Sequence, residues 1–502
     1  MNKKSKNNQE EAVSDAAVME KKSGKRPEEG GKKKPGTKLK GFLSILIMLA
    51  AYWISGAGLV VFMRNNWQPD INMLGALIAL LMAFGAFGCY MMIRHKDLTS
   101  SLRQMLFVSV LLVVANILTL VTMSINVGFV PSLLSVLLIA LMANEKAAML
   151  SCIPISVIAG VAASIVDGNR SGPLAIVMAL IISGLTAVYA LNMRKTRSST
   201  VVASFLAGIT GVITYAAVMM ASGEILMNYW ENLLWLLGSC ILCGILTVGL
   251  MPVFEALFDI ASEARLNELL NNDNPLLKRL MTEAPGTYHH SLLVAALGEA
   301  AAQSIGANAL LVRVSAYYHD VGKLRSPACF KENQHGYNIH DELDPYESAK
   351  RIIAHQQDGV TLLEKAKFPS DVTKTVGMHH GDSVMVFFYD KAKKAAPEGA
   401  EIDIAKFRYP SKKPNTKEAA ILMLADCCEA AVRSMNNPTM DEIRAKVREV
   451  MTHKWDKRDS MLWESPLTFT EIKQIEESFL NTFAALHHER VEYPDLEEID
   501  VR

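Results

Sequence analysis

The sequence predicts an all-α protein in which a polytopic helical membrane domain precedes a soluble all-α domain. Long apolar runs fill residues 41–258, whereas residues 259–502 have the composition of an ordinary soluble domain. In that second part apolar residues recur at helical spacing, and eleven of the twelve histidines lie after residue 280. A histidine distribution this uneven indicates a functional site in the soluble domain.

The first 40 residues are polar and basic, with 12 Lys and Arg against 6 Asp and Glu. A segment with so few large apolar residues cannot bury enough surface to fold, so we expect residues 1–40 to be a disordered basic tail. A second, short tail is expected at 491–502.

The block at 41–258 contains eight apolar runs, at about 41–63, 71–93, 104–124, 128–143, 146–166, 173–192, 200–221 and 233–257. A helix needs about 20 apolar residues to cross the hydrocarbon core, and most of these runs provide them. The run at 128–143 is short, and Asn144–Lys146 separates it from the next run. We therefore expect eight spans, with seven as the alternative.

Lys and Arg are distributed unevenly between the loops. They flank the loop at 94–103 and crowd the loop at 194–197, while the alternate loops hold few positive charges. Cytoplasmic loops carry the excess of Lys and Arg, so we expect the N-terminal tail to lie in the cytoplasm. With eight spans, the C-terminal domain lies there as well.

The soluble part is expected to be almost entirely helical, with a connector at 259–283 and a domain at 284–490. Helices are predicted at 287–304, 308–323, from Asp344 onward, 417–434 and 470–488. Asp344-Pro345-Tyr346-Glu347 has the form of a capping box with proline at the first helical position. Residues 383–416 break the helical pattern, which predicts a strand-like excursion or a long loop.

The adjacent pair His319-Asp320 is the most informative feature of this domain. An imidazole nitrogen and a carboxylate can bind metal together, and the carboxylate can bridge two cations. A second pair, His340-Asp341, lies in a polar loop before the helix that starts at Asp344, so we interpret it as a chance occurrence. Other candidate ligands surround the first pair at helix-to-helix spacings.

Helical faces select these ligands. His290 shares an apolar stripe with Leu293 and points into the domain, whereas His289 does not. Asp426 also lies on an apolar stripe, where a carboxylate is costly unless it is paired. Metal ligation is favoured there over the alternative, a salt bridge to Arg433. The predicted metal ligands are His290, His319, Asp320, His355, His379, His380 and Asp426.

These ligands offer only nitrogen and oxygen, which suits Mn, Fe or Mg better than a Zn site built on cysteine. Seven ligands exceed what one ion needs, so we expect two divalent metal ions. Two metals about 3.5–4 Å apart can hold the attacking and leaving oxygens of phosphoryl transfer. Lys323, one turn after Asp320, is placed to hold a phosphate oxygen. The alternative is an exposed lysine at a helix end.

These motifs resemble those of a known family. The arrangement of His290, His319-Asp320 and Asp426 is similar to the H…HD…D pattern of the HD-superfamily metal phosphohydrolases. Over about residues 40–490 the chain resembles the seven-transmembrane HD-domain phosphodiesterases. The motifs that carry this resemblance are Glu283-Ala-Pro-Gly-Thr-Tyr-His-His-Ser291, His319-Asp-Val-Gly-Lys323, Glu332-Asn-Gln334, His379-His-Gly381, Phe407-Arg-Tyr-Pro410 and Glu429-Ala-Ala-Val-Arg-Ser434.

The resemblance implies a multi-pass protein of a bacterial cell membrane that hydrolyses cyclic di-AMP to linear pApA at a two-metal site, with Mn or Fe as the expected ions. It implies that one ion is held by His290, His319, Asp320 and Asp426. It implies that the other is held by Asp320, His355, His379 and His380, so that Asp320 is the bridge.

For the substrate, we expect Lys323, Arg433 and Lys413 to hold phosphates, and Phe407 and Tyr409 to stack on a base. The expected partners are cyclic di-AMP and the lipid bilayer, with no nucleic acid, and a homodimer is left open. The alternatives are an HD phosphohydrolase that acts on another cyclic dinucleotide or nucleotide, and a non-catalytic nucleotide-binding receptor.

The sequence departs from the family in one place. Family members carry a large extracellular domain after the first span, whereas residues 62–72 leave room only for a short hairpin here. The related class that cleaves cyclic di-GMP has Gly-Tyr-Pro after the paired histidines. In this chain Gly381-Asp382-Ser383 comes after them, which disfavours that substrate.

Overall fold

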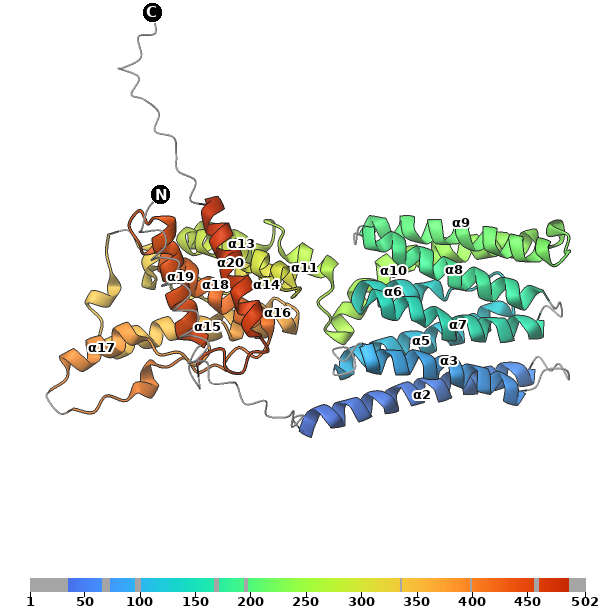
Figure 1. Ribbon diagram of the computed structural model, residues 1–502, viewed down its shortest axis with the longest axis horizontal. Helices are drawn as coiled ribbons and strands as arrows, with labels where there is room; N and C mark the ends of the chain where they lie inside the picture. Colours follow the sequence, from blue (N-terminus) through green and yellow to red (C-terminus); the bar gives the residue numbers. More distant parts are fainter. Residues whose placement is uncertain are drawn as a thin grey trace, which may run out of the picture. The chain divides into compact units, whose positions relative to one another are not determined.

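The structure is a computed structural model in which all the described regular elements are helices (Figure 1). It describes residues 35–65, 73–94, 101–166, 171–193, 197–334, 336–397, 400–455 and 460–486. Most of the predicted N-terminal tail, the whole C-terminal tail, most of the short hairpin and most of both basic loops lie outside these ranges. Residues 35–40, predicted as the end of the tail, belong to the first helix.

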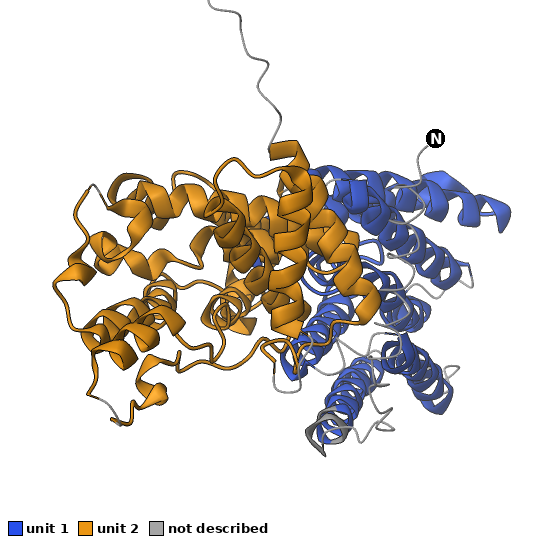
Figure 2. Cartoon of the chain, turned by 60° about the vertical axis from the view of Figure 1, so that its left-hand side comes forward, with its two compact units in different colours: residues 1–194, 198–251 blue, residues 195–197, 252–502 orange. Residues whose placement is uncertain are grey.

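The chain divides into two compact units, coloured separately in Figure 2. Unit 1 comprises residues 1–194 and 198–251, and unit 2 comprises residues 195–197 and 252–502. The apolar helices make up the first unit. The second contains all the predicted metal ligands.

The helices of the apolar region lie side by side (Figure 1). They are α2 (Pro35–Asn65), α3 (Met73–Arg94), α5 (Leu102–Met123), α6 (Leu133–Met142), α7 (Glu145–Val166), α8 (Gly172–Met193), α9 (Arg197–Ala221) and α10 (Trp230–Phe258). Seven of these described helices are long and apolar enough to cross a membrane. The chain is therefore a multi-pass membrane protein with seven candidate spans, the number that the sequence left as the alternative.

Helix α6 is the exception, because its 10 residues rise only about 15 Å. The stretch before it is not helical, and it contacts α10 at successive turns. Ser239 Oγ donates to Val130 O at 3.5 Å, and Cys243 Sγ lies 3.2 Å from Pro131 O. Val130 and all but one of the residues of α6 are buried. Non-helical backbone is tolerated at membrane depth where protein surrounds it, as it does here.

Unit 2 is helical as predicted, with a connector made of two short helices, α11 (Glu263–Leu269) and α12 (Pro275–Glu283). The remaining α-helices are α13 (Pro285–Ser304), α14 (Ala309–Tyr318), α15 (Pro345–Lys365), α16 (Ser370–Gly377), α17 (Val386–Ala395), α18 (Lys417–Arg433), α19 (Met440–Trp455) and α20 (Phe469–Leu486). The cap at Asp344 forms as expected, since its side chain accepts a hydrogen bond from the Tyr346 N–H.

Two local predictions were wrong. The helix predicted at 308–323 ends at Tyr318, and a 3₁₀ turn, η2 (Val321–Arg325), comes next. The excursion at 383–416 contains α17 and a short 3₁₀ turn, and its only extended pairing among the described residues is a bridge between Val384 and Arg408. Tyr389 lies within α17, although Val384–Tyr389 has strand-like composition. In α17 Phe388 and Ala392 are buried four residues apart, so packing on one helix face outweighs that composition.

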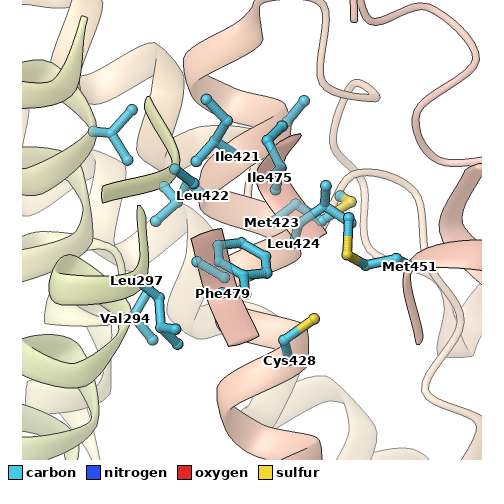
Figure 3. Close-up of a cluster of buried hydrophobic side chains, with 14 of the residues drawn as sticks. Val294, Leu297, Ile421, Leu422, Met423, Leu424, Cys428, Met451, Ile475 and Phe479 are labelled. Carbon is cyan, nitrogen blue, oxygen red and sulfur yellow. The ribbon is translucent and has the colours of Figure 1, made fainter. Parts of the chain in front are cut away.

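A hydrophobic core forms where α13 and α14 meet α18, α19 and α20. Figure 3 shows Ile421, Leu422, Met423 and Leu424 of α18 among side chains from the neighbouring helices. All four are fully buried. Helix α18 is thus surrounded on most sides, and its packing fixes the carboxylate of Asp426, which lies two residues after this run.

Candidate metal centre

Two groups of potential ligands lie in unit 2. One comprises His290, His319 and Asp426, and the other comprises His355, His379 and His380. Within each group, one ligand atom from every residue lies within 4.8 Å of the others. In the first group all three residues are buried, and in the second only His380 is partly exposed.

Asp320 lies between the two groups and turns one carboxylate oxygen toward each. Its Oδ2 is 3.2 Å from His319 Nε2 and 3.8 Å from His290 Nε2. Its Oδ1 is 3.3 Å from His355 Nε2 and 4.0 Å from His379 Nε2. This is the arrangement expected of a carboxylate that bridges two cations.

The local fold explains how Asp320 reaches both groups. Helix α14 ends immediately before the pair, and η2 packs directly on the backbone of α15. A β-carbon added to Gly322 would lie 1.8 Å from the carbonyl oxygen of His355, so only glycine permits this approach. The close contact brings the turn after Asp320 against the helix that supplies His355.

Three of the histidines are oriented in the same way. In each, Nδ1 bonds the main-chain carbonyl three residues earlier. The distances are 2.8 Å from His319 to Ala316, 2.5 Å from His355 to Ile352 and 2.6 Å from His379 to Val376. The Nδ1–H donates, so each Nε2 is the ring nitrogen that remains to bind a cation.

Those three Nε2 atoms are buried and, within the described part of the chain, have no hydrogen-bond partner. Buried polar atoms are normally hydrogen-bonded, so three unpaired ring nitrogens that point toward one carboxylate need an explanation. Divalent cations would satisfy them, and the donor set of imidazoles and carboxylates fits such ions. The residues present therefore fit a two-cation centre.

His290 is held differently. Its Nδ1 is hydrogen-bonded to Oε2 of Glu429, and its Nε2 is 3.1 Å from Asp426 Oδ1. The glutamate is 2% exposed and lies on α18, one turn after Asp426. Glu429 begins one of the motifs that carry the resemblance, but the sequence analysis gave it no role. A second carboxylate on the apolar face of that helix was a signal that could have indicated one.

Electrostatics separate the two groups. Burial alone would lower the pKa of His319, but the carboxylates of Asp320 and Asp426 outweigh it and raise that pKa to about 10. Burial and the neighbouring His319 and His355 lower the pKa of His379 to about 3, and burial and His379 lower that of His380. Although burial would raise the pKa of Asp320, His319 and Lys323 hold it well below its usual range.

Lys323 is not an exposed helix-end lysine. Its Nζ is 2.7 Å from Asp320 Oδ2 and 2.6 Å from Glu332 Oε1, and it lies 4.8 Å from the centre of the Phe330 ring. Glu332 also accepts from the Thr287 hydroxyl at 3.2 Å. Glu332 belongs to one of the motifs that carry the resemblance, but its ion pair with Lys323 could not be predicted from the sequence.

The other two residues predicted to bind phosphate, Arg433 and Lys413, lie in different surroundings. The Arg433 guanidinium is 43% exposed, and its Nε is 3.6 Å from Glu429 Oε1, so its acidic partner is not Asp426, the alternative considered for that aspartate. The Lys413 Cα is 3.6 Å from where a β-carbon on Gly381 would lie, which places its backbone beside the paired histidines.

Tyr409 is buried, and the centre of its ring lies 4.4 Å from that of His380. Phe407 is fully buried in a separate hydrophobic cluster and offers no surface to a base, so the suggestion that it stacks is wrong. Neither His340 nor Asp341 belongs to the two ligand groups. The His340 Nε2–H donates to the carbonyl of Cys329 at 2.8 Å.

Two family descriptions match the chain. Residues 71–262 match the family described as 7TM receptor with intracellular HD hydrolase, and residues 287–431 match the HD domain family. Both matches agree with the order of elements in the structure.

The chain is similar to two relatives named cyclic-di-AMP phosphodiesterase PgpH. It is 39% identical to that of Bacillus subtilis (strain 168) over 377 residues, which is 74% of this chain and 52% of the relative. It is 36% identical to that of Listeria monocytogenes serotype 1/2a (strain 10403S) over 376 residues, covering 74% of this chain and 51% of the relative. The chain thus spans about half the length of these curated relatives.

Two solved structures of the HD domain of the L. monocytogenes phosphodiesterase PgpH are also similar. One is 40% identical, with a TM-score of 0.40, and covers 43% of this chain and 100% of the solved chain. The other, in complex with cyclic di-AMP, is 41% identical, with a TM-score of 0.41, and covers 44% and 100%. On the residues that match the two family descriptions, and on the 39% identity to the B. subtilis relative over 377 residues, the chain belongs to the family of 7TM receptors with an intracellular HD hydrolase domain.

Proposed function

We propose that the chain is a membrane-anchored, metal-dependent phosphodiesterase that hydrolyses cyclic di-AMP to linear pApA. The observation that carries the proposal is the position of Asp320, whose two oxygens face separate groups of buried histidine nitrogens. The relatives named as cyclic-di-AMP phosphodiesterases support the choice of substrate. In this proposal the HD domain lies on the cytoplasmic side of a bacterial cell membrane, as does the basic tail. This requires an eighth crossing, which we assign to the short apolar helix α6 together with the buried residues before it.

The proposed ligands divide between two ions with Asp320 common to both. His290, His319 and Asp426 hold one ion, and His355, His379 and His380 hold the other. Bound divalent ions supply Lewis acidity toward phosphoryl oxygens and lower the pKa of coordinated water. The nitrogen and oxygen donors favour Mn or Fe.

Lys323 is the proposed phosphate ligand. Its ammonium group contacts both Asp320 and Glu332, so it keeps one partner when Asp320 binds cations. Glu332, fixed by Thr287, then holds the ammonium at the edge of the centre, where it faces a phosphate oxygen of the substrate. Arg433 and Lys413 are proposed to bind the second phosphate.

We propose that Tyr409 supports the metal centre by packing against His380. Its buried ring packs against that imidazole, and the main-chain N–H of Tyr409 donates to Ser383 O at 2.9 Å. These contacts fix the loop that carries the paired histidines. Only a small part of this ring is exposed and could stack on an adenine. We therefore assign Tyr409 mainly to positioning His380.

The test uses the full chain in detergent micelles with Mn²⁺ and cyclic di-AMP, with products separated by chromatography. We expect pApA to accumulate, and a His319→Ala variant to form none above background. A parallel panel of cyclic di-GMP and deoxynucleoside triphosphates measures selectivity.

Equal rates for wild type and His319→Ala would overturn the assignment of the site. Faster turnover of another member of the panel would keep a phosphohydrolase but replace its substrate. Binding of cyclic di-AMP without turnover under Mn²⁺ or Fe²⁺ would identify a receptor instead.

A further inference from the structure

One histidine of the first ligand group, His290, is held differently from the others whose Nδ1 partner is known. His319, His355 and His379 each bond a neutral main-chain carbonyl through Nδ1. His290 bonds the carboxylate of Glu429 instead. The difference matters because the partner of one ring nitrogen controls how strongly the other nitrogen donates to a metal.

The bond to His290 is the one hydrogen bond of the Glu429 carboxylate among the described residues. The glutamate is 2% exposed, and its second oxygen, Oε1, is buried without a hydrogen-bond partner in the described structure. The nearest cation to that oxygen is the Arg433 guanidinium at 3.6 Å, which is itself 43% exposed. Burying a carboxylate is costly unless it is paired, so the bond to His290 is its main stabilising contact.

The chemical consequence concerns the free nitrogen of His290. A carboxylate that accepts from Nδ1–H fixes the tautomer, and it also pulls the proton and enriches the ring in electron density. A carbonyl fixes the tautomer but adds no charge. His290 is therefore the strongest imidazole donor of the four.

The charges around the two groups reinforce this difference. Besides the shared Asp320, the His290 group has Asp426 as a ligand and Glu429 behind it. The other group has three imidazoles, and the nearest additional carboxylate is Asp426, 3.8 Å from His380 Nδ1. Lys323 contacts Asp320, but its charge is offset by Glu332.

We propose that Glu429 is a positioning residue that makes the His290–His319–Asp426 group the tighter of the two cation sites, the first to fill and the last to empty. This deepens the proposed function, because it concerns the same two-metal site. It does not depend on the identity of the substrate. The His355–His379–His380 group is then the site from which metal exchanges.

The experiment measures Mn²⁺ binding to the metal-free full chain in detergent, without substrate. Wild type should bind two ions in two phases, and the first equivalent should give the electron paramagnetic resonance spectrum of an isolated ion. The second equivalent should introduce coupling between the ions. Glu429→Gln keeps the size of the side chain and an oxygen that accepts from His290, but removes the charge.

In Glu429→Gln we expect the dissociation constant of the tight phase to rise by roughly 10–100-fold, as is typical when an outer-sphere partner is lost. The weak phase should change less than about twofold, so the two phases approach each other. The matched control is Glu476→Gln, which removes a carboxylate that is paired with Arg448 at 3.0 Å and, among the described residues, is not hydrogen-bonded to a ligand histidine. It should bind as wild type does.

Two results would overturn the proposal. One is unchanged binding in Glu429→Gln, and the other is equal weakening of both phases, which would indicate a general structural role. If the variant does not fold, chelator release from wild type decides: one ion should leave well before the other, and simultaneous loss would refute the asymmetry. None of these measurements uses cyclic di-AMP, so they stand apart from the test of hydrolysis.

Discussion

The pairs His319-Asp320 and His340-Asp341 are the same dipeptide in the same domain, and both histidines are buried. Each also bonds a main-chain carbonyl through one ring nitrogen. His319 uses Nδ1 to bond Ala316 O, while His340 uses Nε2 to bond Cys329 O. The ring nitrogen that bonds the carbonyl therefore distinguishes the predicted cation ligand, His319, from the structural residue, His340.

Nε2 is the nitrogen farther from the backbone, so leaving it free lets histidines from several helices converge on one point. His319 does so beside Asp320, which is 3% exposed. The free nitrogen of His340, Nδ1, lies close to its own backbone, and the ring packs against Phe388. Asp341 is exposed and accepts a hydrogen bond from Asn338. A His-Asp dipeptide therefore indicates a metal site only in suitable surroundings.

The largest difference between the pairs should appear when each aspartate is changed to asparagine. In Asp320→Asn the bridging charge is lost from both groups, and we expect hydrolysis to fall by on the order of 10³-fold or more, since metals supply several kcal/mol to such reactions. Bound Mn²⁺ should fall well below two equivalents. Steady-state kinetics and elemental analysis of the purified chain measure both effects.

Asp341→Asn is the matched control, because it changes the same side chain after a buried histidine. Its rate should stay within about twofold of wild type, as expected for an exposed polar change. Comparable losses in the two variants would show that the second pair also serves the site.

The pH dependence of metal binding should sharpen the contrast further. In the metal-free chain Asp320 and Asp426, acting against burial, raise the pKa of His319 to about 10, so a cation must displace its proton. Between about pH 6 and 9 the release of the His319 proton alone should raise the affinity of that group about tenfold per pH unit. His379, with a pKa lowered by burial to about 3, loses none. Calorimetric titration at several pH values measures both phases.

The stability of the metal-free domain should change in the opposite direction. Because the folded pKa of His319 lies above its ordinary value of 6.5, its stabilising contribution is complete below pH 6.5 and is lost as the pH rises toward 10. Melting curves of the chelated chain should therefore shift downward over that range. A metal affinity that stays flat between about pH 6 and 9 would contradict the assignment of His319 as a proton-bearing ligand.

Much of the site could be predicted from residue type and spacing, and the rest depended on contacts across the chain. Helical faces were enough to turn His290 and Asp426 inward, because a 3.6-residue period fixes direction. They did not reveal Glu429 as the partner of His290, since 139 positions separate the two. The end of α14 before His319 was also missed, because it depends on the fit of Gly322 against α15. Composition favoured a strand at Val384–Tyr389, where burial of Phe388 selects a helix.

Glu332→Gln should have an intermediate effect on hydrolysis. It tests a second difference between the two pairs, the residue three positions after each aspartate. Beyond Asp320 that position is Lys323, which Glu332 holds, whereas beyond Asp341 it is Asp344, a helix cap. Without the Glu332 charge the ammonium loses its second partner, and misplacement should lower kcat/KM by roughly tenfold. Elemental analysis should still find two equivalents of Mn²⁺. A loss of metal instead would mean that Glu332 supports the cations directly.

The smallest effect on function, and a clear one on stability, is expected from His340→Ala. This change removes the hydrogen bond to Cys329 O and the ring packed on Phe388, at a cost of about 2 kcal/mol. For a domain of this size that corresponds to a melting temperature lower by roughly 4–8 °C. Because Nε2 of His340 is occupied by a carbonyl, metal content and both binding phases should match wild type. Weakened Mn²⁺ binding in folded His340→Ala would show that the second pair also supports the metal centre. The choice of ring nitrogen would then not distinguish a metal ligand from a structural histidine.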